Sequence, residues 1–176
     1  MIAWHLGAAI FLFRWIFRDP KVDIRFLAVG ALLPDVIDLP VGTVLLADRY
    51  STGELWFHSL LVPTLVVVVV LAFTRRGRRR RGWMALAVGM FFHLLVDGMW
   101  TSAETFFWPF FGLGFPTGPT PYWDGAWARA LGDPIRWVLE GIGLVYLITL
   151  WRRSGLSQPG NLQLLAKQGR LPEVSA

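Results

Sequence analysis

The chain has 176 residues, enough for one domain, of which 55% are hydrophobic and 16% charged, and its formal net charge is +5 at neutral pH. Soluble domains average about 45–50% apolar and about 25% charged residues, so this composition favours a protein of the lipid bilayer. The chain has no cysteine, which excludes disulfides and thiolate metal sites and leaves His, Asp, Glu and backbone oxygens as possible metal ligands.

The chain begins with two apolar segments that are long enough for short or tilted membrane helices. The first, Ile2–Phe17, has no basic region before it and no small-residue cleavage motif before Arg14, so we expect a retained helix and no removable signal peptide. The second, Ile24–Leu39, carries two carboxylates near its end. These two segments are expected either to span the membrane or to pack as a hairpin against the other helices.

Three further apolar segments follow. Leu55–Phe73 and Trp83–Trp100 are each close to the roughly 20 residues that cross a hydrocarbon core about 30 Å thick. Ile135–Trp151 is shorter and ends at two arginines. We therefore predict an all-α fold, a polytopic membrane bundle of about five helices. The bundle is expected to occupy residues 1–153, and residues 154–176 to form a flexible cytoplasmic tail with room for one short helix.

The basic residues lie mainly on one side of this layout. If the N-terminus is outside and the helices alternate, the inner side receives 14 of the 17 Lys and Arg residues, namely Arg14, Arg18, Lys21, Arg25, Arg75, Arg76, Arg78, Arg79, Arg80, Arg81, Arg152, Arg153, Lys167 and Arg170. The positive-inside rule then predicts an outer N-terminus, a cytoplasmic C-terminus and a multi-pass location in the bacterial inner (cytoplasmic) membrane.

The arginine-rich run at residues 75–81 is best interpreted as a topology anchor that also contacts anionic membrane lipids. Nucleic acid is not expected as a partner, because a short loop between two spans offers no aromatic or groove-reading side chain.

Five ionisable residues that are distant in the sequence are expected to meet near the outer face: His5, Asp35, His58, His93 and Asp97. His93 and Asp97 are four residues apart and share one helical face. Such groups are costly in or beside hydrocarbon unless they are paired or bound to a metal. Three imidazoles and two carboxylates suit zinc, with manganese and iron as alternatives. Taken singly, each residue could also be an ordinary interfacial histidine or a turn aspartate.

The same residues lie in short motifs that occur in a fixed order: Trp4-His5-Leu6-Gly7, Gly30-Ala-Leu-Leu-Pro-Asp35-Val-Ile-Asp38, Phe57-His58-Ser59-Leu60 and Phe92-His93-Leu-Leu-Val-Asp97. Through them, residues 1–115 resemble bacterial inner-membrane metal-dependent hydrolases of the LexA-binding or LexA-regulated type. That family is in turn distantly similar to the helical zinc-dependent phospholipase C.

The resemblance implies a ligand set. One metal ion would be held by Asp35, His58, His93 and Asp97, and His5 would hold a second ion, with Asp97 as the bridge. The soluble relatives complete a third site with further histidines downstream, whereas this chain has no histidine after His93. We therefore expect one or two divalent ions, with zinc preferred, and no trinuclear site.

The function predicted from these residues is metal-dependent hydrolysis of a small or lipid phosphoester at the outer face. Zinc can lower the pKa of a bound water to about 7 and polarise a phosphoryl oxygen. Asp38 is expected to orient the water or an imidazole, Glu104 to act as a general acid or base, and Arg136 to bind the phosphate. Glu140, four residues after Arg136, is expected to pair with it.

Two other functions stay open. One is a non-enzymatic protein that binds a metal or relays ions or protons, for example as a transporter subunit. A transporter would need polar residues that reach both faces, whereas the inner halves of the predicted helices are apolar. A scaffold whose basic loop recruits a cytoplasmic partner would tolerate loss of the histidines. The sequence does not indicate an oligomeric state.

Overall fold

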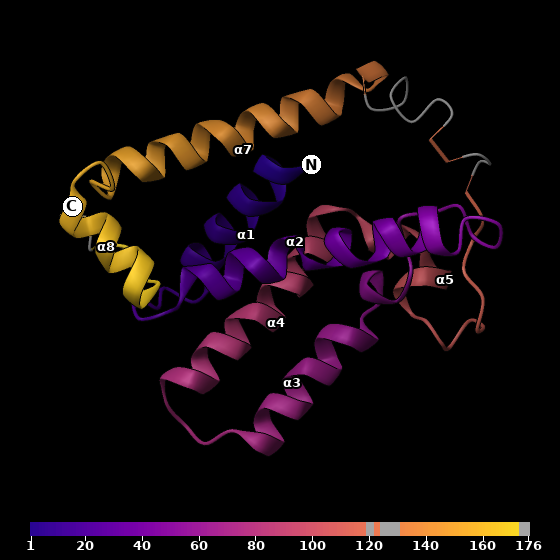
Figure 1. Ribbon diagram of the computed structural model, residues 1–176, viewed down its shortest axis with the longest axis horizontal. Helices are drawn as coiled ribbons and strands as arrows, with labels where there is room; N and C mark the ends of the chain where they lie inside the picture. Colours follow the sequence, from indigo (N-terminus) through magenta and orange to yellow (C-terminus); the bar gives the residue numbers. More distant parts are fainter. Residues whose placement is uncertain (119–121, 124–130, 173–176) are drawn as a thin grey trace.

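The computed structural model describes residues 1–118, 122–123 and 131–172, and every regular element in these ranges is helical (Figure 1). The elements are, in chain order, α1 (Ile2–Ile16), α2 (Ile24–Pro40), the π-helical turn η1 (Val41–Leu45), the 3-10 turn η2 (Trp56–His58), α3 (Leu61–Phe73), α4 (Arg78–Val96), the 3-10 turn η3 (Met99–Thr101), α5 (Ala103–Phe106), α7 (Pro134–Arg153) and α8 (Pro159–Gln168). The all-α prediction is confirmed for the described residues.

Two of the long helices begin with an aspartate cap. The Asp23 side chain accepts a hydrogen bond from the Arg25 N–H at the start of α2, and Asp133 accepts one from the Ile135 N–H at the start of α7. These caps satisfy backbone donors that have no partner within the helix. Pro134 then occupies the first turn of α7, where its missing N–H costs nothing.

The helix bounds differ from the predicted ones beside the polar residues. The segment expected to begin a helix at Leu55 forms the turn η2 first, and α3 starts only at Leu61, because the N–H groups of Leu55 and His58 bond to a carboxylate of α2. The helix α4 ends before Gly98, which has a φ of 70°. The helix α2 continues through η1, so Asp35 and Asp38 lie inside a helical segment and not at its end.

The core of the bundle is the crossing of α2 and α4. A Cβ atom added to Gly30 of α2 would lie 2.1 Å from the Leu86 carbonyl oxygen, and one added to Gly89 of α4 would lie 2.3 Å from the Leu27 carbonyl oxygen. Only glycine permits so close an approach of the two backbones. The buried apolar cluster around this crossing comprises Ala9, Ile10, Phe13, Val22, Ile24, Leu27, Ala31, Ala85 and Phe92.

The helix α7 packs against α1 and lies on the outside of the bundle (Figure 1). The contact is close at Gly7 and Gly143, since a Cβ added to Gly143 would lie 2.3 Å from the Ala3 carbonyl oxygen. Most of the apolar residues of α7, Ile135 and Val145 among them, are exposed. A helix that is apolar on its exposed faces needs an apolar surrounding such as lipid.

Among the described residues, two helical segments are long and apolar enough to cross a membrane, Ile24–Leu45 and Pro134–Arg153. The helices α1 and α3 are apolar but shorter, and α4 begins with four arginines. Five spans, and the direction in which the chain crosses the bilayer, therefore stay predictions.

The segment expected to be a flexible tail contains the helix α8. Leu165 of this helix packs on the core, and so does Leu171, three residues after the end of the helix. The Ile24 N–H donates to the Gly169 carbonyl at 2.7 Å, and Arg78 donates to the Gln168 carbonyl at 3.0 Å. A short amphipathic helix thus gains its order from tertiary contacts. Residues 173–176 of that segment lie outside the described residues.

Candidate metal centre

Four of the five predicted metal ligands meet at one point between α2, η2 and α4. Asp35, His58, His93 and Asp97 each offer one ligand atom, and these atoms all lie within 4.8 Å of one another. Asp35 comes from the middle of α2, His58 from η2, and His93 and Asp97 from the end of α4. Residues from three separate stretches of chain can therefore hold one metal ion.

Several distances within the group are close to those of ligand atoms around a tetrahedral metal. With metal–ligand bonds of about 2.0–2.2 Å, two ligand atoms of a tetrahedral zinc lie about 3.3–3.6 Å apart. The two Nε2 atoms of His58 and His93 are 3.2 Å apart, and the Asp35 Oδ1 atom lies 3.5 and 3.7 Å from them. The Asp97 Oδ2 atom lies 3.5 Å from the His93 Nε2 atom and 3.9 Å from the His58 Nε2 atom.

Both imidazoles are turned so that Nε2 faces this point. The Nδ1 atom of His93 lies 2.8 Å from the Ala31 carbonyl oxygen, and the Nδ1 atom of His58 lies 2.8 Å from the Asp38 carboxylate. Because both partners are acceptors, each Nδ1 carries a proton and the two Nε2 atoms point at each other. Two lone pairs facing each other repel unless a cation, either a metal or a proton, lies between them.

Asp38 is buried directly behind His58. Its Oδ2 atom accepts hydrogen bonds from the Nδ1–H and N–H of His58 and from the N–H of Leu55, while its Oδ1 atom has no hydrogen-bond partner among the described residues. A carboxylate behind a metal-binding imidazole fixes its tautomer and raises its basicity. Asp38 is thus hydrogen-bonded to an imidazole that it was expected to orient, and its part in catalysis stays a prediction.

The electrostatic field at η2 favours a cation. Burial alone would lower the pKa of His58, but the carboxylates of Asp35 and Asp38 outweigh it and raise that pKa to about 9. The same negative field attracts a divalent metal ion.

His5 lies beside the four-ligand group and not within it. Its Nε2 atom is 2.8 Å from the Asp97 Oδ1 atom, its Nδ1 atom contacts the Met1 carbonyl oxygen, and its ring stacks on His93 with centroids 4.3 Å apart. Asp97 thus directs one oxygen to His5 and the other to the group around His93. That arrangement is compatible with a bridging carboxylate.

The ligand group opens on a cavity of about 620 Å³ between α1, α2, the end of α4 and the start of α7. The imidazoles are buried, whereas the side chains of Asp35 and Asp97 are 39% and 21% exposed. A ligand or water could therefore reach the metal position from the carboxylate side. The rest of the lining includes Tyr122, Trp123 and Asp133.

Arg136 lines this cavity, whereas Glu104 does not. The Arg136 Nε atom lies 3.3 Å from Asp133, so the expected pair with Glu140 is replaced by a pair with the helix cap. Glu104 is exposed on the short helix α5. Glu54, which the sequence analysis did not select, lines the cavity. Its position four residues before His58 was the one available signal.

Glu140 has a different role. Its Oε2 atom accepts a hydrogen bond from the Trp4 N–H at 3.0 Å, and so caps the first turn of α1 from a neighbouring helix. His5 is the next residue of α1, so this contact helps to hold its imidazole beside Asp97.

The helical architecture, the apolar exposed helices and the centre of histidines and carboxylates define a membrane protein with a candidate metal site. The sequence profile of the YdjM inner membrane protein family matches residues 2–158, and the chain belongs to that family. This match supports the predicted inner-membrane family. The resemblance to LexA-type hydrolases and to phospholipase C stays a prediction. No curated protein and no solved structure matches the chain.

Proposed function

We propose that this protein is a metal-dependent hydrolase of the inner membrane that cleaves a phosphoester of a lipid or another amphiphile. The observation that carries the proposal is that three of the four candidate ligands, Asp35, His58 and Asp97, line an open cavity. Catalytic metal sites keep a coordination position for water or substrate. With four protein ligands here, that position would be a fifth one on the side of the cavity, where Asp35 and Asp97 are partly exposed.

The donor set suits zinc, with manganese or iron as alternatives, and the contact of Asp97 with His5 allows a second ion. When bound, such an ion supplies a Lewis acid and lowers the pKa of a coordinated water to about 7. In the reaction, a water molecule gives a proton to a carboxylate of the cavity as its oxygen forms a bond to phosphorus, the ester P–O bond breaks, and the departing alkoxide takes up that proton.

Other residues of the chain would orient the imidazoles, bind the phosphate and exchange a proton with the leaving group. Asp38 and the Ala31 carbonyl fix the two imidazoles, so little reorganisation is needed during the reaction. Arg136 stands at the rim of the cavity with an exposed side chain, where its guanidinium can bind a phosphate in a bidentate manner. Glu54 is the carboxylate of the cavity wall that can exchange a proton with the leaving group.

The amphiphilic substrate follows from where the cavity lies. Apolar residues of α7 and aromatic residues line it beside the polar ones, among them Ile135, Leu139 and Trp123. In the orientation that the basic residues favour, the cavity opens at the extracytoplasmic face, close to the outer leaflet.

An ion or proton relay is less well supported. Such a pathway needs polar groups that continue to the other end of the bundle. Below the metal centre the described core consists of apolar side chains, including Phe13, Leu27 and Ala31.

The test is hydrolysis by purified protein of bis(p-nitrophenyl) phosphate and of phospholipid in mixed micelles, with metal content measured on the same sample. We expect hydrolysis that stops on chelation and returns with zinc. Arg136→Gln should keep the metal and raise KM by about tenfold or more, because a charged hydrogen bond to the phosphate is lost. Glu54→Gln should lower kcat, and Glu104→Gln serves as its matched control.

A sample with stoichiometric metal and no hydrolysis of phosphate monoesters, phosphate diesters or carboxyl esters would contradict the proposal. Equal activity in Arg136→Gln and the wild type would remove the phosphate-binding role alone.

A further inference from the structure

A second hollow lies at the other end of the bundle, far along α1 from the metal centre. It has a volume of about 390 Å³ and is formed by the end of α1, the turn into α2 and the segment that follows α8. Its lining combines basic and apolar side chains: Arg14, Arg18, Asp19, Pro20, Val22, Ile24, Leu171 and Pro172. None of these residues has a part in the proposed hydrolysis.

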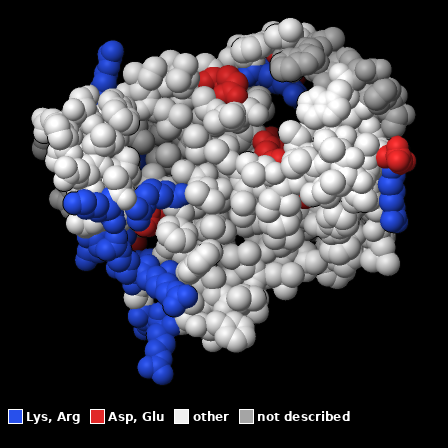
Figure 2. All heavy atoms as spheres, viewed as in Figure 1, with Lys and Arg blue, Asp and Glu red and all other residues white. Residues whose placement is uncertain are grey.

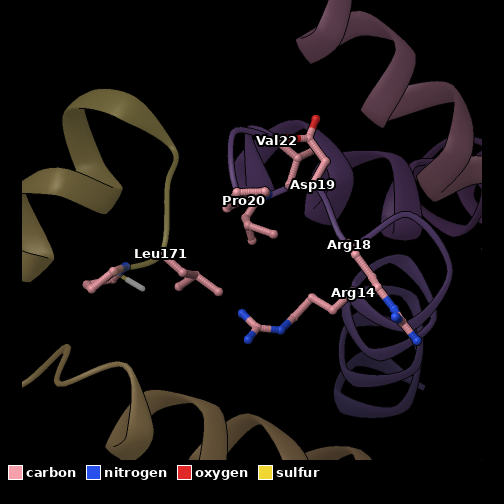
Figure 3. Close-up of a pocket in the computed structure, with 8 residues that line it drawn as sticks. Arg14, Arg18, Asp19, Pro20, Val22 and Leu171 are labelled. Atoms are coloured by element: carbon pink, nitrogen blue, oxygen red, sulfur yellow. The ribbon is translucent and has the colours of Figure 1, made fainter. Parts of the chain in front are cut away.

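Arg14 is the side chain that enters the hollow. Figure 3 shows it reaching toward Leu171 across the open space, while Arg18 stands at the margin and the carboxylate of Asp19 points away. Neither arginine forms an ion pair within the part of the chain that the structure describes. The Asp19 carboxylate is occupied by the Lys21 N–H, at 2.8 Å. An uncompensated guanidinium beside a cavity is a site for an anion.

The turn that carries these groups has a fixed shape. Arg18 has a φ of 49°, in the left-handed region that residues other than glycine seldom adopt. Val22 and Ile24 are buried directly after it. The wall of the hollow therefore includes buried apolar side chains, whereas the two arginines are exposed.

The hollow lies where the candidate membrane spans end. Ile24, which lines it, is the first residue of the candidate span Ile24–Leu45, and the other candidate span finishes at Arg153 on the same side. In Figure 2 most Lys and Arg side chains gather at this end, around α8 and the beginning of α4. A phosphate at this level meets a positive field, and an acyl chain attached to it can follow the apolar surface of the helices.

We propose that this hollow binds the headgroup phosphate of an anionic phospholipid, with Arg14 as the primary contact and Arg18 as the second. The apolar wall of Val22, Ile24 and Leu171 takes the glycerol and the first part of the acyl chains. Because Leu171 follows α8, the bound lipid also ties the C-terminal segment to the bundle.

The experiment measures lipid retained by the full-length protein in detergent, by native mass spectrometry. The probes are phosphatidylglycerol, phosphatidylcholine and inorganic phosphate. We expect retention of phosphatidylglycerol over phosphatidylcholine, and a loss of about fivefold or more in Arg14→Gln, since the charged contact to the phosphate is removed. Arg79→Gln is the matched control, because Arg79 lies at the same end but outside the hollow.

Two further variants keep the result decisive if Arg14→Gln does not fold. Arg14→Lys keeps the positive charge but loses the planar guanidinium with its paired N–H donors. This variant should retain phosphatidylglycerol to an intermediate degree. Arg18→Gly removes the second charge at a φ that glycine tolerates, and should weaken lipid retention without unfolding the protein.

Equal losses in Arg14→Gln and Arg79→Gln would overturn the proposal, because binding would then follow overall surface charge. Equal retention of the two lipids would also overturn it. Displacement of the lipid by inorganic phosphate at equal concentration would show a small-anion site and reject the lipid.

Discussion

The two ends of the bundle treat charged groups in opposite ways. At the metal centre, Asp38 and His93 are fully buried and bonded to groups from other elements. At the basic end, Arg14 and Arg18 are exposed and have no carboxylate partner among the described residues. A buried charge needs a specific hydrogen-bond or ion-pair partner, whereas an exposed charge is stabilised by water and by mobile counter-ions. One end therefore has the buried, paired groups of a candidate ion site, and the other has exposed, unpaired arginines.

The largest effect should come from changing the crossing of α2 and α4, which forms the core of the bundle and also positions the metal centre. Gly89→Ala places a methyl group against the Leu27 carbonyl and must push α4 away from α2, which separates His93 from Ala31. We expect a loss of about 1–3 kcal/mol of stability and of bound metal. Thermal unfolding and metal analysis measure both.

Gly82→Ala is the matched control on the same helix. Its added Cβ would lie 3.4 Å or more from the Phe26 ring, an ordinary contact. This variant should keep its metal and gain up to about 1 kcal/mol from helix propensity. If both alanines behaved alike, the close crossing would not be what positions the metal centre.

A smaller effect is expected from Asp38→Asn. The substitution keeps the volume but removes the negative charge behind His58, so metal affinity should fall by about 10–100-fold while the fold survives. Competition with a fluorescent chelator gives the Kd. Asp48→Asn, at an exposed position nearby, should leave the Kd unchanged. An unchanged Kd in Asp38→Asn would mean that this carboxylate does not support the ligand.

Glu140→Ala tests whether α7 supports the metal end. The change removes the acceptor for the Trp4 N–H and should cost about 1 kcal/mol, as loss of a helix cap does. A melt in detergent measures the cost, with the exposed Glu104→Ala as the comparison. Equal melting temperatures in the two variants would show that the contact is dispensable.

The smallest effect belongs to the basic end. Burial opposes ionisation of Asp23, but its hydrogen bonds with Arg25 outweigh burial and lower its pKa below the ordinary 3.8. The ionised carboxylate therefore stabilises the fold above about pH 4, and this contribution is lost as the pH falls through the lowered pKa.

Asp23→Asn keeps the helix cap and removes only the charge, so it should cost less than about 1 kcal/mol at pH 7. Melts of the two proteins at several pH values should converge in acid. A difference that grew in acid would contradict this assignment.

The sequence predicted the chemistry of the metal centre better than the helices that carry it. The spacing of His93 and Asp97, and the short motifs around Asp35 and His58, indicated a common ligand group. The interruption before α3 was not predictable, because it depends on the contact of Asp38 with the Leu55 N–H, 17 residues away in the chain. Local apolarity continues through that point and suggests one long helix.

The partners of Glu140 and Arg136 were also not predictable from local sequence. Glu140 lies one turn from Arg136, which favours a local pair, but the structure assigns Glu140 to α1 and Arg136 to Asp133. The role of α8 escaped prediction as well, because its polar composition says nothing about contacts with Arg25 and Arg78. Residues that bond across elements need the tertiary structure to be assigned.

The acceptor behind His93 is a main-chain carbonyl, that of Ala31. No substitution at position 31 can alter the chemistry of that acceptor, so the tautomer of one imidazole is set by the backbone itself. The partner of the other imidazole is a side chain and can be exchanged. A redesign of the metal preference of this candidate site would therefore vary Asp38 and the two carboxylates Asp35 and Asp97. The tautomer and orientation of His93 would stay the same.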